Sequence, residues 1–194
     1  MKLYFIRHGQ SEANIRGTHA GWGDFPLTEQ GRLDAQRAKK SLSGIKFDKV
    51  YSSDLSRAIE TQKIALPDNV GEQTAILREI NVGTLSGMPF EEARQKLGEE
   101  YSENRRNFAF DNYGGESYAD FCLRVREFFS MTESSPCENV AAFCHGGFIN
   151  TALDIVAGAS LDRDIFKCGN CSVSVFEYKD GKWSLNLWNY MGDI

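Results

Sequence analysis

His8 and His145 each stand at the end of an apolar run of the sequence, His8 one residue beyond it, and a glycine follows each of them. The chain has only three histidines, so the shared setting of these two suggests a shared purpose. Arg7 precedes His8, and its permanent charge disfavours protonation of the neighbouring imidazole. A neutral His8 could be a nucleophile or a metal ligand, although a single histidine at such a place more often has a structural role. A second arginine, Arg57, follows a third apolar run, which ends in two serines at 52–53.

Two arginines beside two histidines favour phosphate chemistry over metal binding. Guanidinium groups recognise phosphate through paired, charge-assisted hydrogen bonds. A metal site has little support, because no Asp, Glu or Cys accompanies either histidine at ligand spacing and the arginines would repel a cation. We therefore expect covalent catalysis, in which one neutral imidazole attacks phosphorus while the arginines neutralise the phosphoryl oxygens.

Such a reaction also needs a proton donor for the leaving oxygen. Glu79 lies in a segment punctuated by Gly83 and Gly87, which favours a loop over a helix. It is one of 27 acidic residues, so the residue pattern by itself selects it only weakly.

The elements that must position these residues can be predicted from periodicity. Apolar runs at 3–6, 47–52 and 140–144 predict strands buried on both faces. Helices are predicted over 28–42, 54–66, 118–131 and 148–157, with Leu33 on the apolar face of the first and Ser53 as N-cap of the second. Two C-terminal strands joined by Asp180-Gly181 complete the pattern. The alternation indicates an α/β fold, a three-layer α/β/α sandwich with a mostly parallel central sheet and an antiparallel C-terminal hairpin, in a single domain over 1–194.

The carboxyl ends of parallel strands meet at one edge of a sheet, where open α/β sheets bind ligands. The predicted strands therefore bring both histidines and both arginines to the same edge. The longest irregular segment is predicted at 104–116, and loops of that length are often functional. Its Arg105-Arg106 pair could bind a substrate carboxylate, but a solvated basic turn explains it better. His19, in a loop rich in Gly and Thr near the predicted site, could contact substrate, but a position at the surface is the favoured explanation.

Composition excludes several classes of function. The chain has 194 residues, of which 41% are hydrophobic and 25% charged, and its net charge of −5 provides no overall basic field for nucleic acid or an anionic membrane. Only four consecutive apolar residues precede Arg7, so we expect no signal peptide and a cytoplasmic protein. Five scattered cysteines are expected to be reduced. Cys168 and Cys171 form a C-x-x-C motif, but it leads into a strand-like segment and lacks a second Cys/His pair, so a redox or metal role is not favoured.

Several motifs together resemble the histidine phosphatase superfamily, also called the phosphoglycerate mutase-like family. The matching segments are Arg7-His8-Gly9-Gln10-Ser11-x-x-Asn14, Pro26-Leu27-Thr28-x-x-Gly31, Ser52-Ser53-x-x-x-Arg57-Ala58-x-x-Thr61, Leu77-x-Glu79-x-x-x-Gly83, Gly114-Gly115-Glu116-Ser117 and His145-Gly146-Gly147. They occur in the family's order and spacing from one end of the chain to the other.

The resemblance implies a role for each matching residue. His8 would be the nucleophile that forms a phosphohistidine, and Glu79 would protonate the leaving alcohol and then activate water. Arg7, Arg57 and His145 would hold and polarise the phosphoryl group. The expected substrate-binding residues are Asn14, Gln10, Ser11, Gly21, Trp22 and Gly146. The scheme requires no metal or other cofactor.

The family contains both hydrolases and mutases, and the residues after the acid favour a hydrolase. Mutases that resemble this chain carry an arginine, an aromatic residue and a polar group there, where this chain has Ile80, Asn81 and Val82. The length and the cysteine-containing segment before the last hairpin resemble the alpha-ribazole phosphatase group. We expect hydrolysis of a small-molecule phosphomonoester by a monomer or homodimer. The alternatives are phosphoryl transfer between hydroxyls, as in phosphoglycerate mutases, and a non-catalytic module that binds a phosphorylated ligand.

Overall fold

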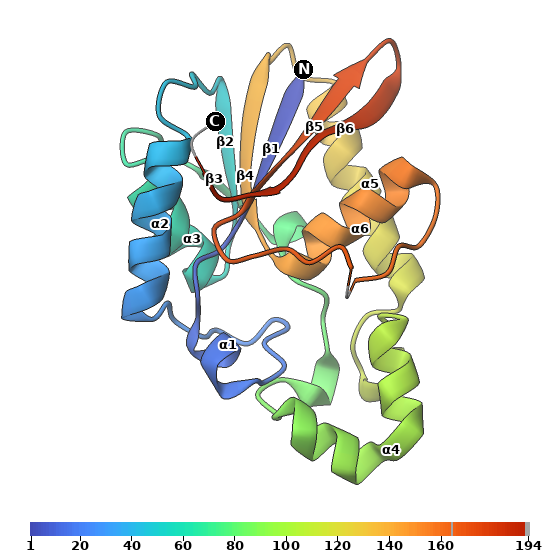
Figure 1. The fold of residues 1–194 in the computed structure, drawn as a ribbon. Helices are drawn as coiled ribbons and strands as arrows, with labels where there is room; N and C mark the ends of the chain where they lie inside the picture. The colour runs from blue at the N-terminus through green and yellow to red at the C-terminus, as the bar shows by residue number, and fades with distance from the viewer. Residues whose placement is uncertain (164, 193–194) are drawn as a thin grey trace.

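The computed structural model describes residues 1–163 and 165–192, and in them six strands form one mixed sheet (Figure 1). The strands are β1 (Lys2–Arg7), β2 (Lys49–Ser53), β3 (Glu72–Thr74), β4 (Asn139–Cys144), β5 (Val173–Lys179) and β6 (Lys182–Tyr190). Their order in the sheet is β3-β2-β4-β1-β5-β6. The first four pair in parallel, whereas β5 runs antiparallel to both β1 and β6. The expected mostly parallel sheet with an antiparallel C-terminal hairpin is confirmed.

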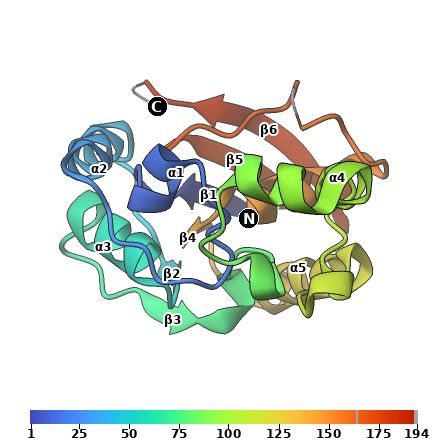
Figure 2. The same ribbon diagram turned by 90° about the horizontal axis from the view of Figure 1, so that it is seen from below.

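Helices cover both faces of this sheet. They are α1 (Glu12–Arg16), α2 (Glu29–Ser41), α3 (Ser56–Ala65), α4 (Phe90–Arg106), α5 (Tyr118–Glu133) and α6 (Gly146–Ala157). In Figure 1, α2 and α3 lie on one side of the sheet, and α5 and α6 lie on the other. The view from below in Figure 2 shows α1 and α4 lying across the end of the sheet at which the parallel strands terminate. The three-layer architecture is thus confirmed, with α4 as an addition at the ligand-binding end.

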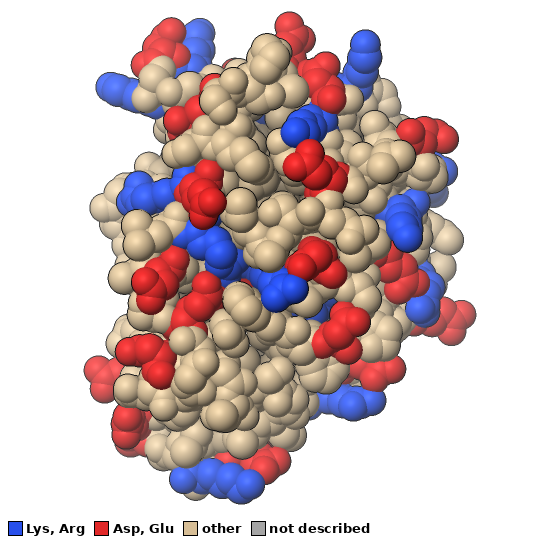
Figure 3. Space-filling model, turned by 180° about the vertical axis from the view of Figure 1, so that it is seen from behind, with Lys and Arg blue, Asp and Glu red and all other residues tan. Residues whose placement is uncertain are grey.

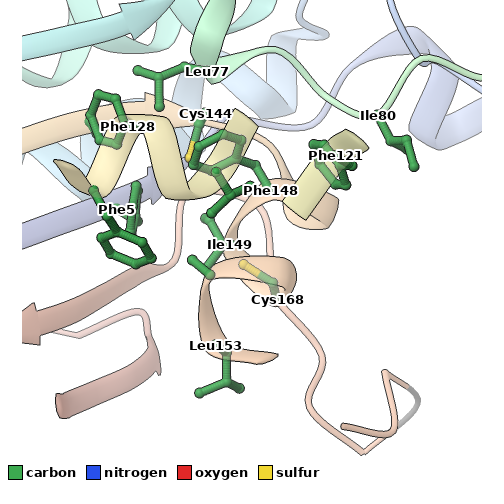
Figure 4. Close-up of a cluster of buried hydrophobic side chains, with 14 of the residues drawn as sticks. Phe5, Leu77, Ile80, Phe121, Phe128, Cys144, Phe148, Ile149, Leu153 and Cys168 are labelled. Atoms are coloured by element: carbon green, nitrogen blue, oxygen red, sulfur yellow. The ribbon is translucent and has the colours of Figure 1, made fainter. Parts of the chain in front are cut away.

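Alternating side chains of β1 supply two separate apolar cores. Leu3 and Phe5 pack into the larger core with residues of α5 and α6, while Tyr4 and Ile6 pack into the smaller one with residues of α2 and α3. Figure 4 shows the larger core, in which the ring centroid of Phe5 lies 6.0 Å from that of Phe128 and 5.8 Å from that of Phe148. The burial of β1 on both faces follows from its continuous apolar run.

The tight turn of the last hairpin agrees with its sequence. Asp180 and Gly181 both have positive φ angles, 52° and 76°, as a two-residue turn of the I′ type requires. Thr28 caps α2 by accepting a hydrogen bond from the Gly31 amide, and Ser117 caps α5 by accepting one from the Asp120 amide.

Three expectations are wrong in detail. Ser53 does not cap α3, because it ends β2 and the N-cap of α3 is Leu55. Leu33 is 48% exposed, since it lies on the solvent side of α2. The segment 104–116 is not wholly irregular, because its first three residues complete α4 and a 3₁₀ turn occupies Asp111–Tyr113. Helix α4 itself is absent from the sequence prediction, and the non-helical Gly98 (φ 67°) inside it interrupts the periodicity by which it could be recognised.

Charged side chains of both signs are interspersed over the face shown in Figure 3. Among the residues that the structure describes, no helix combines the length and the apolar character needed to cross a bilayer.

Two glycines permit the start of α2 to pack against the segment that follows β1. A Cβ atom on Gly9 would overlap the Gly31 carbonyl oxygen, and one on Gly31 would overlap the Gln10 carbonyl oxygen. Thr61 in α3 fixes the same segment, since its hydroxyl accepts a 3.0 Å hydrogen bond from the Gly9 amide. The position of His8 is therefore set by backbone packing from two neighbouring helices.

Gly31→Ala should lower the free energy of unfolding by about 1–3 kcal/mol, because the added methyl group meets rigid backbone atoms rather than a flexible side chain. Urea titration would measure the change, with Gln36→Ala on the exposed face of α2 as the control. The control should change stability by less than about 0.5 kcal/mol. Equal stability of the two variants would show that the contact between residues 9–10 and 31 can relax freely.

Candidate active site

The predicted reactive residues come together at the ends of neighbouring strands and, for Glu79, in a loop that follows a 3₁₀ turn. Arg7 ends β1 and His8 follows it, His145 follows β4 as the N-cap of α6, and Arg57 lies in the first turn of α3. Arg7, His8, Arg57 and Glu79 all line one cavity of 590 Å³. His145 lies behind the cavity wall, fully buried, with its ring centroid 5.1 Å from that of His8.

His8 is held in one tautomer with a lone pair available for attack. Its side chain is almost fully buried, and Nδ1 lies 2.7 Å from the Gly9 carbonyl oxygen. A carbonyl oxygen can only accept, so Nδ1 carries the hydrogen and Nε2 keeps its lone pair. Burial lowers the pKa of His8 well below its usual value, and the nearby charges of Arg57 and Arg7 lower that pKa further. The imidazole is therefore neutral and nucleophilic at neutral pH.

The two arginines are held by carbonyl oxygens instead of carboxylates. Arg57 is completely buried and donates 2.9 Å hydrogen bonds to the carbonyl oxygens of Gly23 and Gly21. Arg7 donates to the carbonyl oxygen of Cys168. Burial lowers the pKa of Arg57 to about 10, so it still carries its charge at neutral pH. Neither arginine forms a salt bridge within residues 1–163 and 165–192, so both charges are available to a phosphoryl group.

His145 is oriented by β2. Its Nε2 lies 2.9 Å from the Ser53 hydroxyl, and Nδ1 is buried with no hydrogen-bond partner in the described part of the chain. Burial lowers the pKa of His145 well below its usual value, with Arg57 and His8 as further causes. His145 is thus a neutral group beside His8, and one nitrogen has unused hydrogen-bonding capacity.

Glu79 is fixed at the cavity wall by two backbone amides. Its Oε1 accepts a 3.0 Å hydrogen bond from the Ile80 amide, and its Oε2 accepts a 3.1 Å bond from the Gly147 amide. A side chain at position 147 would overlap this carboxyl group, which explains the second glycine of the His145-Gly146-Gly147 segment. Trp22 donates its Nε1 hydrogen to the main-chain oxygen of Glu79 at 2.8 Å.

The predicted substrate-binding residues do not all face the cavity. Asn14 and Gly21 line it, and Gly146 lines a neighbouring pocket of 470 Å³ that shares Arg7 and Glu79 with it. Gln10, Ser11 and Trp22 lie outside its lining: Gln10 accepts a hydrogen bond from Thr28, Ser11 forms a capping box with Asn14, and Trp22 is partly exposed. A role in substrate binding for these three stays a prediction.

Several cavity residues lie outside the motifs that the sequence offered. His19 was expected at the surface, which is wrong, because it is 5% exposed and its Nε2 lies 2.7 Å from the Tyr101 hydroxyl. Arg105 and Arg106 are exposed as expected, but they line the cavity as well. Other missed lining residues are Phe90, Phe108, Phe110 and Arg163. No local pattern marks them, because they are brought together by long-range packing of α4 and of the segment after α6.

The C-x-x-C motif is not arranged as a redox pair. Cys168 packs into the larger apolar core, near Phe148 and Ile149 in Figure 4, whereas Cys171 packs into the smaller core on the opposite face of the sheet. Both are free thiols, and burial raises the pKa of each, that of Cys171 to about 12. Neither is therefore a reactive thiolate at neutral pH. In the described residues, no group of three His, Cys, Asp or Glu side chains is arranged to hold a metal ion.

The burial of His19 predicts a measurable loss of stability in acid. Burial and the charge of Arg105 lower the pKa of His19 to about 4, so between about pH 6.5 and pH 4 the unfolded state binds a proton that the folded state does not. The free energy of unfolding therefore falls as the pH is lowered through this range. In His19→Gln, which can still bond to Tyr101, the fall between pH 7 and pH 5 should be smaller by about 2 kcal/mol. Urea titrations at both pH values test this, and an unchanged fall would show that His19 is protonated in the folded protein.

Comparison with known proteins agrees with this geometry. The family model of the histidine phosphatase superfamily (branch 1) matches residues 3–191. Two curated 2,3-bisphosphoglycerate-dependent phosphoglycerate mutases are similar to the chain: that of Bartonella bacilliformis is 33% identical over 85% of each chain, and that of Brucella ovis is 36% identical over 83% of this chain and 84% of the relative. The solved alpha-ribazole phosphatase of Shigella flexneri is 26% identical, with a TM-score of 0.88 over 100% of this chain and 98% of that one. Because this family model matches nearly the whole chain, the chain belongs to the histidine phosphatase superfamily.

Proposed function

We propose that this protein hydrolyses a small-molecule phosphomonoester through a covalent phosphohistidine. The observation that carries the proposal is the state of His8: a neutral imidazole, with Nδ1 bound to a carbonyl oxygen, in one cavity with Arg7, Arg57 and Glu79. An imidazole in this state can donate its Nε2 lone pair, and two unpaired guanidinium groups can stabilise the charge that develops on the phosphoryl oxygens.

In the first step, Nε2 of His8 attacks phosphorus and the bond from phosphorus to the substrate oxygen breaks. Glu79 gives its proton to the leaving oxygen, which departs as an alcohol. The transferred group becomes a phosphoryl imidazole, and the two arginines and His145 neutralise or polarise its oxygens. Arg57 needs little movement to do so, because backbone oxygens of Gly21 and Gly23 already orient its guanidinium group.

In the second step, water attacks the phosphoryl imidazole. The Glu79 carboxylate takes a proton from the water, the new bond from oxygen to phosphorus forms, and the bond from nitrogen to phosphorus breaks. His8 regains its neutral form and inorganic phosphate leaves. Glu79 returns to the protonated form in which it began, so the cycle consumes only ester and water.

The wall beside Glu79 supports a hydrolase over a mutase. Ile80 and Val82 line the cavity and are each 3% exposed, and Asn81 turns its side chain into the loop, where Oδ1 accepts a hydrogen bond from the Gly83 amide at 3.0 Å. These three positions therefore offer no basic or hydroxyl group to retain a bisphosphate. The likeness to the Shigella flexneri alpha-ribazole phosphatase is further support.

The first test is phosphate release in excess EDTA by wild-type protein and His8→Ala. Alpha-ribazole 5′-phosphate, 3-phosphoglycerate, phosphoserine and 4-nitrophenyl phosphate form a suitable panel. The wild type should release phosphate from at least one of them, and His8→Ala should be slower by at least about a thousandfold while unfolding at a similar urea concentration. Wild-type rates in the variant would contradict the assignment of the nucleophile. Phosphate binding without any turnover would indicate a non-catalytic module.

Glu79→Gln tests the proton donor separately. A good leaving group such as 4-nitrophenolate needs little protonation, whereas an alkoxide needs a full proton. The variant should therefore lose about 10²–10⁴-fold in kcat with an alkyl phosphate and much less with 4-nitrophenyl phosphate, provided that formation of the phosphohistidine limits the rate. Burst kinetics would identify the limiting step. An equal loss with both esters in the first step would contradict the acid role.

A mutase is the second candidate, and one observation favours it. Arg105 and Arg106 line the cavity, and within the described part of the chain neither forms a salt bridge, so both could bind an anionic group of a phosphoglycerate. The curated relatives from Bartonella bacilliformis and Brucella ovis are named as phosphoglycerate mutases. Conversion of 3-phosphoglycerate to 2-phosphoglycerate that depends on added 2,3-bisphosphoglycerate, and that exceeds phosphate release, would establish this alternative.

A further inference from the structure

Arg124, on α5, binds the main chain of the segment that carries Glu79. Its Nη1 donates to the carbonyl oxygens of Ile76 and Arg78 at 2.8 and 2.7 Å, and its Nη2 donates to that of Glu79 at 3.1 Å. These carbonyl oxygens belong to a segment without helix or strand hydrogen bonds beyond its one 3₁₀ turn. A single side chain thus supplies three of the bonds that define its path.

Glu116 extends this contact to the other side of Glu79. It accepts hydrogen bonds from Nε and Nη2 of Arg124 at 2.9 and 2.8 Å, and one from the Asn81 amide at 2.6 Å. The Glu116 amide in turn donates to the Asn81 carbonyl oxygen at 2.9 Å. The side chains of Glu116 and Arg124 are only 16% and 14% exposed, so the ion pair is largely shielded from water. The main chain is therefore held both before and after the acid.

The carboxyl group of Glu79 depends on this path. Within residues 1–163 and 165–192 it accepts hydrogen bonds from only two groups, both backbone amides, and one of them belongs to its own neighbour Ile80. A shift of the main chain at residues 78–81 would move the carboxyl group relative to the leaving oxygen above His8. General acid catalysis requires hydrogen-bond distance to the atom that is protonated, so such a shift would slow proton transfer.

We propose that Arg124 and Glu116 are positioning residues that fix the main chain around Glu79 and so set the place of its carboxyl group. The inference rests on the proposed function, in which Glu79 is the proton donor. It requires arginine specifically at position 124. A planar guanidinium group has five N–H donors directed along fixed lines, and can bind a carboxylate on one side and carbonyl oxygens on the other. A lysine has three donors on one atom and cannot span both sets.

The test compares Arg124→Gln, Arg124→Lys and Glu116→Gln with Arg126→Gln, whose side chain is exposed on the same helix. The measurements are kcat and KM for glycerol phosphate and 4-nitrophenyl phosphate at a temperature at which every variant is folded by circular dichroism. Arg124→Gln should lose at least about tenfold in kcat with the alkyl ester and less than about threefold with the aryl ester, with KM changed little. Glu116→Gln should lose less in the same direction, Arg124→Lys should restore at most part of the loss, and Arg126→Gln should match the wild type.

Equal losses with both esters in the first step, which burst kinetics isolates, or full restoration by Arg124→Lys, would overturn the proposal. The first result would place the defect outside proton transfer to the leaving oxygen, and the second would mean that charge alone suffices.

Amide exchange gives a readout that does not depend on turnover. Residues 76–83 should exchange at least about tenfold faster in Arg124→Gln than in Arg126→Gln, because local opening of this segment becomes easier. Unchanged exchange would overturn the positioning role whatever the kinetics. If wild-type protein hydrolyses neither of these esters nor any ester of the panel above, the proposed function fails, and the exchange experiment still decides whether Arg124 and Glu116 fix this segment.

Discussion

The candidate site depends on a buried positive charge that forms no salt bridge with any described residue. Arg57 is the largest fully buried side chain, and its guanidinium group is held by the carbonyl oxygens of Gly21 and Gly23. A carboxylate at that place would stabilise the empty site but would also compete with a phosphoryl group for the same donors. Carbonyl dipoles lower the free-energy cost of burying the guanidinium group and leave its charge available to a phosphoryl group. Burial lowers the pKa of His8, and the charges of Arg57 and Arg7 lower it further, so one arrangement favours both anion binding and a neutral imidazole.

The acid is placed by different means from the nucleophile. His8 follows directly on a central strand and is fixed by backbone packing through Gly9 and Gly31, so its position is determined by the sheet. Glu79 lies on a loop whose following residues pack against backbone, since a Cβ atom on Gly83 would overlap the Tyr113 carbonyl oxygen. The loop also relies on side chains that reach it from elsewhere, among them Trp22 and Arg124. His8 is therefore held by the packing of the sheet, whereas the position of Glu79 also depends on a few polar contacts.

The central strands and the reactive residues were predictable, because both leave local patterns. A strand buried on both faces must be apolar along its length, and the positions of His8 and Arg57 follow from where such runs end. The cavity wall was not predictable. His19 is buried because it meets Tyr101, which is 82 residues away, and no local pattern reports such a contact. Helix α4 was not predicted for a related reason: few of its residues are buried, and Gly98 interrupts its hydrophobic periodicity.

The groups of the proposed reaction and much of the outer cavity wall come from different stretches of the chain. The reacting groups come from strand ends and the Glu79 loop, whereas much of the outer cavity wall comes from α4 and the residues just after it, among them Phe90, Arg105 and Phe110. The two stretches meet at several points: Glu116 binds Asn81, a Cβ atom on Gly83 would overlap the Tyr113 carbonyl oxygen, and one on Gly115 would overlap that of Asn81. We expect exposed side chains of the outer wall, such as Arg105, to tolerate exchange, whereas Gly115 and Glu116 are needed to hold the loop of Glu79. Side chains that shape the outer wall can therefore change without moving the backbone that carries Glu79.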